Sequence, residues 1–503
     1  MDISVRLGSI TEQAADLIVV NLFQGITQPG GATGAVDAAL GGAIREVIGA
    51  GDFSGKAGET ALIYTRGALP AARVLVVGLG DQARFNAAST RSAAATAARK
   101  ARDLSVRTLA TVVHGAGAGG LDPQTAAQAL VEGTRLGLYR FAGHKSQAPE
   151  DHKADPLEVT IVEVSPTQVT AYQAGLARGE ALASGVALAR DMVNEPGNHM
   201  TPSRMAFVAR QLADQTGLRI QVLGREELAE LGMGILLAVA AESEQPPQFI
   251  VLEHNAGRED LPTVVLVGKG VTFDSGGLSI KPADEMWRMK ADMAGAAAVI
   301  AALGVAVRLD IPLHVVGLAP CAENLPGGRA QKPGDVFTGM TGKTMEVIST
   351  DAEGRMLLAD ALAYAARFRP QAVLDLATLT AAQRIALGPQ AAALFSNDES
   401  LAGRLLAAAE ASGDRLWRMP LYDEYLEAIK SPTADVKNSG GRYGGLGTSA
   451  KFLEHFTEGY PWAHIDMSSM SLSDEDRAVQ PRGATGYGVR LLTAFLEGWD
   501  SGA

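Results

Sequence analysis

The chain has very little cysteine, no excess of basic residues and no long uninterrupted apolar run. Cys321 is the single cysteine among 503 residues, which excludes an internal disulfide and a cysteine-based zinc site and fits a reducing compartment. The formal net charge of −12 argues against a surface that binds nucleic acid over its whole extent. No apolar run reaches about 18 residues without a charge or a glycine, so we expect no membrane span.

The first residues also lack the pattern of a secretory signal. The opening sequence MDISVRLGSITEQAADLIVV contains no basic segment followed by an apolar one. Together with the lone cysteine, this predicts a soluble, cytoplasmic protein. Internal repeats and low-complexity tails are absent from the sequence as well.

Apolar and small residues are what the chain contains in quantity. Hydrophobic residues make up 47% of it and 57 residues are glycine, which suits α/β layers with tight turns. A chain of 503 residues is too long for one core, so we expect two domains. A polar, proline-bearing stretch at 142–156 precedes a strand-like segment at 157–164 and a helix-like segment at 167–194. The predicted fold is α/β, with a smaller N-terminal domain at 1–168 and a larger C-terminal domain at 169–503 that has a central mixed sheet flanked by helices.

Strand-like and helix-like segments alternate along both halves of the chain. In the first half we expect strands at 72–80 and 106–115 and helices at 86–104, opened by Asn86, and at 122–141. This alternation predicts a mostly parallel sheet. In the second half we expect a strand that runs into a loop at 262–275, further strands at 312–323 and 371–380, and helices at 289–309 and 352–368.

Two glycine motifs suggest nucleotide binding but lack the context that it requires. GLGDQA at 78–83 supplies Gly78, Gly80 and Ala83 after a strand, yet no helix begins directly after the turn, so a structural turn is favoured over a dinucleotide site. GMTGKT at 339–344 ends like a phosphate loop, but only two residues separate its glycines. We interpret it as a hairpin turn.

Acidic residues gather at the predicted strand ends and helix starts of the second half. Asp274 ends an apolar strand, Asp292 opens a long apolar helix, and Asp351 and Glu353 precede another helix. In open α/β sheets, ligands bind at the carboxyl ends of the strands. Several carboxylates gathered without a cation would repel one another, and oxygen-rich sets suit Mg, Mn or Zn.

Three basic residues accompany these acids. Lys269 interrupts the apolar run VVLVGKGVTF, and Lys281 and Arg355 lie in the neighbouring motifs. Each residue alone also has an ordinary interpretation: the acids could start helices with a favourable dipole interaction, and Lys269 could be a surface lysine at a strand end. The same pattern in four separate segments makes a metal site the stronger hypothesis.

These segments resemble the leucine aminopeptidase (cytosol aminopeptidase) family, in its bacterial type. The match covers roughly the last two-thirds of the chain, while the first third is similar only in α/β character and size. The motifs that carry it are VNEPGNHMTP (193–202), VGKGVTFDSGGLSIKP (267–282), MKADMAGAAAV (289–299), STDAEGRM (349–356), DLATLT (375–380), SPTADVKNSGGRYGG (431–445), and HIDMSSMS with GATGYGVRLL (464–492).

The resemblance implies a metallopeptidase, a hydrolase that removes leucine and other mostly apolar residues from the free N-terminus of peptides. It implies two divalent ions per subunit, Mn or Zn and otherwise Mg or Co. One would be held by Lys269, Asp274, Asp292 and Glu353, and the other by Asp274, Asp351 and Glu353. Lys281 and Arg355 would be the catalytic pair, with bicarbonate held by Arg355 as the general base. Met289, Thr378 and Ala381 would line the substrate pocket, in a catalytic domain at 169–503. A homohexamer without membrane contact is implied as well.

Three positions depart from the pattern of the family. Ser349 replaces the usual asparagine, Met356 the usual leucine, and Ala381 the glycine that usually follows LATLT. The added methyl group of Ala381 is expected to narrow the substrate pocket. A preference for leucine as the N-terminal residue therefore does not follow from the resemblance.

Two other functions stay open from sequence. Some bacterial relatives also bind DNA, and the basic stretch RSAAATAARKARD at 91–103 permits a nucleic-acid-binding, regulatory role alongside or instead of peptidase activity. A dinucleotide-dependent oxidoreductase built on GLGDQA is the third possibility.

Overall fold

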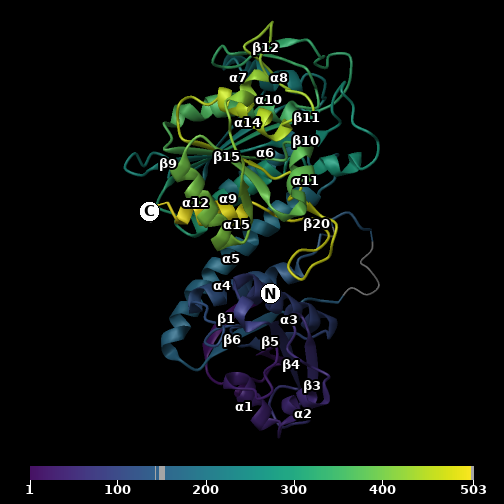
Figure 1. The fold of residues 1–503 in the computed structure, drawn as a ribbon. Coiled ribbons are helices and arrows are strands. Elements are labelled where there is room, and N and C mark those ends of the chain that lie inside the picture. Colours follow the sequence, from purple (N-terminus) through teal and green to yellow (C-terminus); the bar gives the residue numbers. More distant parts are fainter. Residues whose placement is uncertain (142, 147–152, 500–503) are drawn as a thin grey trace. The chain divides into compact units, whose positions relative to one another are not determined.

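The computed structural model describes residues 1–141, 143–146 and 153–499 (Figure 1). These residues form two compact units. Unit 1 comprises Met1–Ser184 and Glu475–Arg482, and unit 2 comprises Gly185–Asp474 and Gly483–Ala503. The polar stretch expected at 142–156 lies partly outside the described residues. The domain boundary near residue 169 stays a prediction.

Unit 1 is built on a six-stranded sheet in which all neighbouring strands are parallel except one edge pair. Its order is β1 (Asp2–Leu7), β6 (Glu158–Glu163), β5 (Thr108–Thr111), β2 (Leu17–Phe23), β4 (Arg73–Gly80) and β3 (Thr60–Tyr64), and β3 pairs antiparallel with β4. The helices are α1 (Gly31–Ala39), α2 (Ala43–Ala50), α3 (Ala87–Asp103) and α4 (Pro123–Leu138), and α5 (Pro166–Asn194) leads into unit 2. The mostly parallel sheet and the helix opened by Asn86 are confirmed, since the Asn86 side chain accepts from the N–H groups of Ala88 and Ser89.

Both glycine motifs have structural explanations. A Cβ on Gly78 would lie 2.1 Å from the carbonyl oxygen of Lys56, so a close approach of two backbone segments requires this glycine. The short 3-10 helix Gln82–Arg84 separates β4 from α3, so the α-helix begins only at Ala87 and not at the glycine turn. The motif at 339–344 joins β12 (Val336–Thr338) to β13 (Thr344–Glu346) as an antiparallel hairpin, as the sequence predicts.

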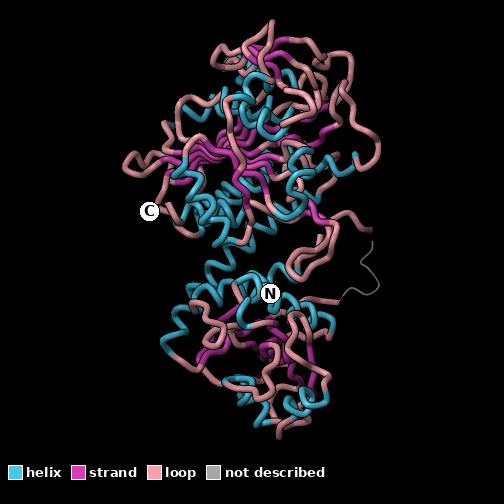
Figure 2. Tube along the Cα trace, in the orientation of Figure 1, coloured by secondary structure: helices cyan, strands magenta, loops and turns pink. Residues whose placement is uncertain are grey.

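Unit 2 contains a nine-stranded mixed sheet between helices, with strands in magenta and helices in cyan in Figure 2. Parallel strands form its centre and antiparallel pairs lie toward both edges. The order is β16 (Leu416–Arg418), β15 (Ala392–Ser396), β18 (Trp462–Asp466), β14 (Ala372–Ala377), β9 (Thr263–Gly268), β11 (His314–Asn324), β8 (Gln248–His254) and β7 (Arg219–Leu223), with β10 (Gly270–Asp274) paired to β11.

Two apolar helices cover the centre of this sheet. Figure 1 shows α10 (Glu353–Ala365) on one side of the strands and α9 (Ala294–Arg308) on the other. The stretch Met286–Arg308 is long and apolar enough to cross a membrane by length and composition, but 89% of its most apolar window is buried within the fold. It is therefore explained as a core helix.

Further helices and short strands complete the described part of unit 2. They are α6 (Pro202–Thr216), α7 (Arg225–Glu230), α8 (Gly234–Val239), α11 (Ala381–Leu387), α12 (Glu399–Ser412), α13 (Glu424–Glu427), α14 (Gly445–His455), α15 (Val489–Glu497), β17 (Val436–Lys437), β19 (Leu472–Ser473) and β20 (Gly483–Ala484).

A glycine lets α9 approach the sheet closely. A Cβ at Gly295 would lie 2.1 Å from the carbonyl oxygen of Leu376 in β14, and that backbone atom has no freedom to move away. We therefore expect Gly295→Ala to lower the free energy of unfolding by about 3 kcal/mol or more. Gly403→Ala in α12 is the matched control: its Cβ meets nothing within 4 Å, and the better helix propensity stabilises by up to about 1 kcal/mol. Thermal unfolding of both variants measures the two changes in stability. Equal changes in Gly295→Ala and Gly403→Ala would contradict the packing argument.

A buried carboxylate joins α10 to two neighbouring elements. Asp360, 1% exposed, accepts one hydrogen bond from the N–H of Leu236 in α8 and one from that of Met340 in the hairpin turn, both at 2.9 Å. Burial raises the pKa of Asp360 to about 6, although the two hydrogen bonds act in the opposite direction. At a pH between the ordinary pKa of an aspartate and this raised value, Asp360 is therefore protonated in the folded protein and ionised in the unfolded protein.

It follows that Asp360 stabilises the fold less as the pH rises. The free energy of unfolding of the native protein, relative to that of Asp360→Asn, should be highest below the unfolded-state pKa. It should fall by about 3 kcal/mol as the pH rises through the folded-state pKa. Denaturant unfolding of both proteins from about pH 4 to about pH 7 measures this difference, and a difference independent of pH would refute it.

Candidate metal centre

The strand expected at 262–275 is interrupted at Lys269, which separates β9 from β10. The backbone of Lys269 is held by other elements: its N–H donates to Leu376 O in β14, and its carbonyl accepts from Ala296 N–H in α9. A Cβ on Gly270 would lie 2.6 Å from Pro320 O, so only glycine lets the chain pass β11 here. The break therefore follows from backbone contacts that a single-strand interpretation does not foresee.

The side chain of Lys269 is buried and surrounded by oxygen atoms. It is 2% exposed, which rules out a surface lysine. Its Nζ lies 2.7 Å from Asp292 Oδ2 and 2.9 Å from Glu353 Oε1, and it donates to the carbonyl of Thr378 at 2.9 Å. Burial lowers the pKa of Lys269, but the charges of Asp292 and Glu353 outweigh it and raise the pKa above its ordinary value.

Asp292 lies at a break in the helix that the sequence predicts at 289–309. The stretch Met286–Ala291 is a 3-10 helix, η3, and α9 begins only at Ala294. Asp292 Oδ1 accepts hydrogen bonds from Lys269 Nζ and from Thr378 Oγ1, both at 2.8 Å. Burial raises the pKa of Asp292 well above its ordinary value, partly opposed by Lys269.

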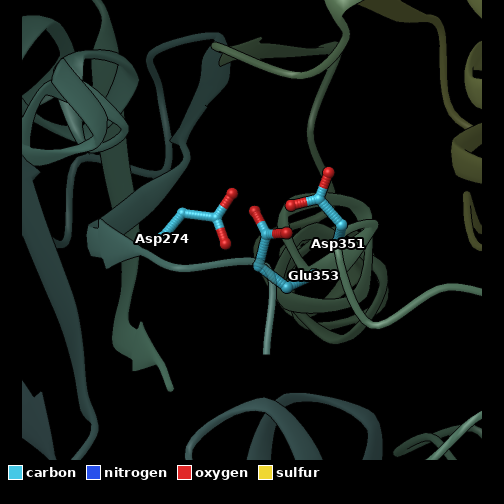
Figure 3. A group of neighbouring side chains, drawn as sticks. All are labelled: Asp274, Asp351 and Glu353. Atoms are coloured by element: carbon cyan, nitrogen blue, oxygen red, sulfur yellow. The ribbon is translucent and has the colours of Figure 1, made fainter. Parts of the chain in front are cut away.

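Three carboxylates converge beside this pair. Figure 3 shows Asp274, at the end of β10, facing Asp351 and Glu353 at the start of α10. One oxygen atom from each lies within 4.8 Å of the others. Burial, reinforced by the charge of Glu353, raises the pKa of Asp274 to about 6. Burial also raises the pKa of Asp351, whereas the charges of Lys269 and Lys281 outweigh burial and lower that of Glu353.

Lys281 connects two of these acids. Its Nζ lies 2.6 Å from Asp274 Oδ2 and 2.6 Å from Asp351 Oδ1, and its side chain is 20% exposed. Burial lowers the pKa of Lys281, but the neighbouring carboxylates, Asp274 first, outweigh burial and keep the ammonium charged. Lys281 is therefore a charged donor at the accessible side of the cluster.

Arg355 lies within α10, two residues after Glu353. It is 8% exposed, Nη1 donates to the Asn438 carbonyl at 2.8 Å, and Nε is buried without a hydrogen bond in the described part of the chain. Burial lowers the pKa of Arg355 to about 10, so the guanidinium stays charged near neutral pH. A planar anion would satisfy the free edge of this guanidinium.

The structure brings together six of the seven residues that were expected to bind metal or act in catalysis, and Arg355 follows Glu353 by two residues in α10. Of the predicted pocket residues, Thr378 contacts Asp292, half-buried Met289 belongs to η3 and exposed Ala381 begins α11. Their role as a substrate pocket stays a prediction. Ser349 Oγ accepts from Asp351 N–H at 3.3 Å, so the serine supports the turn that carries Asp351.

Two asparagines that position this cluster were missed from sequence. Asn324, at the end of β11, donates to Asp274 Oδ1 at 2.8 Å and to the Thr350 carbonyl at 3.0 Å. Asn438 accepts from the N–H of Ile348 and donates to the carbonyl of Ser349, while its own carbonyl holds Arg355. Asn324 is a polar residue at the end of an apolar strand, as Asp274 is, so the pattern that predicted Asp274 as a site residue could also have identified Asn324.

The cluster has the properties of a cation site. Four carboxylates face two lysines. Asp292 Oδ2 has Lys269 Nζ at 2.7 Å, whereas the buried Glu353 Oε2 accepts no hydrogen bond from any described residue. A buried carboxylate oxygen without a donor is costly, and a divalent cation would satisfy it. The residues present therefore fit a site for divalent ions with oxygen and amine ligands.

The basic stretch at 91–103 is less available than its sequence suggests. Arg91 is buried 3.6 Å from Glu132, Arg99 lies 3.1 Å from Asp476, and Arg102 lies 3.8 Å from Asp155. Paired arginines contribute little to an unpaired basic surface that would attract phosphates. The nucleic-acid-binding role stays a prediction that these contacts do not favour.

Comparison with known proteins gives matches over nearly the whole chain. Residues 187–493 match the catalytic domain of the cytosol aminopeptidase family, and residues 19–148 match the N-terminal domain of that family. A probable cytosol aminopeptidase of Roseiflexus castenholzii is 46% identical over 501 residues, which cover 99% of each chain. A protein of the same description from Syntrophotalea carbinolica is 47% identical over 464 residues, covering 92% of this chain and 93% of that one.

Solved structures agree with these matches. The bottromycin maturation enzyme BotP in complex with Mn has a TM-score of 0.85 and 38% identity, covering 96% of this chain and 99% of its own. A mutant of tomato leucine aminopeptidase has a TM-score of 0.87 and 32% identity, covering 99% and 96% respectively.

Proposed function

The chain belongs to the cytosol aminopeptidase family of metallopeptidase hydrolases, and from this premise we propose that it releases leucine and other mostly apolar residues from the N-terminus of peptides. The observation that carries the proposal is the group of four carboxylates and two lysines, in which the buried Glu353 Oε2 has no donor among the described residues. The Mn complex of a relative supports a divalent ion in this role.

Two ions are proposed for this cluster. Lys269, Asp274, Asp292 and Glu353 would hold one, and Asp274, Asp351 and Glu353 the other. The charges of Asp292 and Glu353 raise the pKa of Lys269 and favour its ammonium form. Beside a bound divalent ion, Lys269 would instead be favoured as a neutral amine that can act as a ligand, because two positive charges would repel each other. When bound, the ions supply a water of lowered pKa and polarise the carbonyl of the scissile bond.

Lys281 and Arg355 are the proposed catalytic pair. The Lys281 ammonium stays charged, and it has one further N–H for the oxygen atom on which negative charge develops. Arg355 offers its unpaired Nε–H to a planar oxyanion such as bicarbonate, which we propose as the proton acceptor. Asn438 fixes both the guanidinium and the turn that leads to Asp351, so it is a positioning residue.

Specificity is proposed to arise at Met289, Thr378 and Ala381. Thr378 has its hydroxyl bound to Asp292 and its carbonyl bound to Lys269, so it is held beside two of the proposed metal ligands. Ala381 is the first residue of α11 and is exposed. An added methyl group at this position favours a somewhat smaller N-terminal side chain than glycine would allow. Assembly as a homohexamer and a cytoplasmic location remain proposals.

Metal removal tests the function directly. Treatment with a chelator is expected to abolish cleavage of leucyl, methionyl and alanyl substrates, and Mn or Zn should restore it, because the attacking water and the polarised carbonyl both depend on the ions. Initial rates across Mn, Zn, Mg and Co, with and without bicarbonate, provide the measurement. Full activity in a chain shown by elemental analysis to be metal-free would exclude the proposed mechanism.

A further inference from the structure

A cavity of about 530 Å³ lies in unit 2, lined by residues that take no part in the proposed chemistry. Cavities of this size hold small molecules in many proteins. Its lining residues are Pro196, Gly197, Asn198, Phe273, Trp287, Lys290 and Glu323. The metal ligands and the catalytic pair are absent from this lining.

The cavity lies behind the elements that carry the metal centre. Phe273 precedes Asp274 in β10, and Glu323 precedes Asn324 in β11, and successive strand residues point to opposite faces. Trp287 and Lys290 are three residues apart in the 3-10 helix η3, where such residues share a face, whereas Met289 lies on another. The cavity and the metal centre therefore use opposite faces of the same backbone segments.

The lining combines an apolar surface with one charge of each sign. Trp287 is 62% exposed, and the ring of Phe273 packs against the loop at Gly197, where a Cβ would lie 3.4 Å from Cδ2. Lys290 Nζ donates to Asn194 O at 2.5 Å and also interacts with the charge of Glu195, and its ammonium has three N–H groups in all. Glu323 Oε2 accepts from Ser243 Oγ at 2.5 Å, and its other oxygen can accept a further donor.

We propose that this cavity binds a small zwitterion with an apolar body, a free amino acid or a dipeptide, and that its occupation changes the turnover of the metal centre. Lys290 binds the carboxylate of the ligand, Glu323 binds its ammonium group, and Trp287 and Phe273 contact its side chain. Occupation acts through the adjacent residues Asp274 and Asn324, since the latter donates to the former. Only this effect on turnover rests on the proposed function.

Calorimetry on the chelator-treated full-length chain tests binding without hydrolysis. L-leucine and leucyl-leucine distinguish the two sources of the zwitterion. Lys290→Met and Glu323→Gln should each weaken binding about 10- to 100-fold, the cost of one charged hydrogen bond. N-acetylleucine lacks the ammonium group and leucinamide lacks the carboxylate. Each should bind the native protein about 10- to 100-fold more weakly than leucine, as the charge variants bind leucine. Trp287→Ala should also weaken binding, whereas Trp417→Ala, which removes a tryptophan of 63% exposure outside the cavity, should not.

Unchanged affinity in both charge variants, or no binding at millimolar leucine, would overturn the site. The effect on turnover is measured with the metal-loaded chain and an alanyl substrate. Leucine should change kcat in the native protein and in Trp417→Ala, but should act only on KM in Lys290→Met. If leucine inhibited the native protein in a purely competitive way, the proposed effect of the cavity on turnover would be wrong. The calorimetric test of binding would be unaffected by that result.

Discussion

Replacement of Glu353 by glutamine is expected to abolish peptide hydrolysis, with a loss of about 1000-fold or more in kcat/KM. Glu353 is proposed to bind both ions, its Oε1 pairs with Lys269, and its buried Oε2 has no hydrogen-bond donor among the described residues. The glutamine amide has the same shape as the carboxylate but carries no charge, so the substitution should weaken the binding of both proposed ions. A 1000-fold loss corresponds to about 4 kcal/mol of transition-state stabilisation, which lies within what bound metal ions supply.

Glu399→Gln is the matched control for this substitution. Glu399 is the first residue of α12, as Glu353 is of α10, but its side chain is 92% exposed and pairs with Arg418. If Glu353 served only the helix dipole, both variants would lose less than about 1 kcal/mol of stability and neither would lose activity. Metal content by elemental analysis should fall in Glu353→Gln alone. Normal turnover in that variant would refute the assignment.

Lys281→Met is expected to lower kcat about 100- to 1000-fold while the ions stay bound. The ammonium lies between Asp274 and Asp351 and is the charged donor at the accessible side of the cluster. Removing one preorganised donor to a developing oxyanion has a cost of this size. Methionine preserves most of the apolar stem, and it removes a competing cation rather than a proposed ligand, so metal content should not decrease.

Lys451→Met separates catalysis from the general effect of losing a lysine between two acids. Lys451 in α14 lies 2.7 Å from Asp423 and 2.6 Å from Glu454, in a geometry like that of Lys281 but away from the metal centre. Its loss should leave kcat unchanged. Steady-state kinetics and thermal unfolding on both variants give the comparison, and a kcat in Lys281→Met equal to that of the native protein would exclude an oxyanion role.

The candidate site was predictable because its residues violate local expectation. Lys269, Asp274 and Asp292 are charged residues within or directly beside apolar segments, and burying a charge is favourable only with a partner. Strand-end position then indicated that these residues share one edge of a sheet. The family resemblance supplied the roles, and the α/β fold with its mostly parallel first sheet followed from alternating strand and helix patterns.

Other features depend on contacts between segments that are distant in sequence. The break at Lys269 arises because β14 and α9 take up its backbone hydrogen bonds, and periodicity within 262–275 carries no trace of this. The break before α9 places Asp292 opposite Lys269 and Thr378. Asn438 acts through hydrogen bonds to residues about 90 positions earlier, so its role becomes visible only in the folded chain.

The backbone contacts of Lys269 have a consequence for the order of folding. Its ammonium donates to the carbonyl of Thr378, a residue 109 positions later in the chain, and its N–H pairs with Leu376 in the same segment. Contacts of such sequence separation form slowly, because the intervening chain must first lose its freedom. A nascent chain that ends before β14 contains every proposed metal ligand but lacks the carbonyl groups of Leu376 and Thr378 that hold Lys269. We therefore expect the proposed metal centre to reach its final geometry only after β14 has been synthesised and packed.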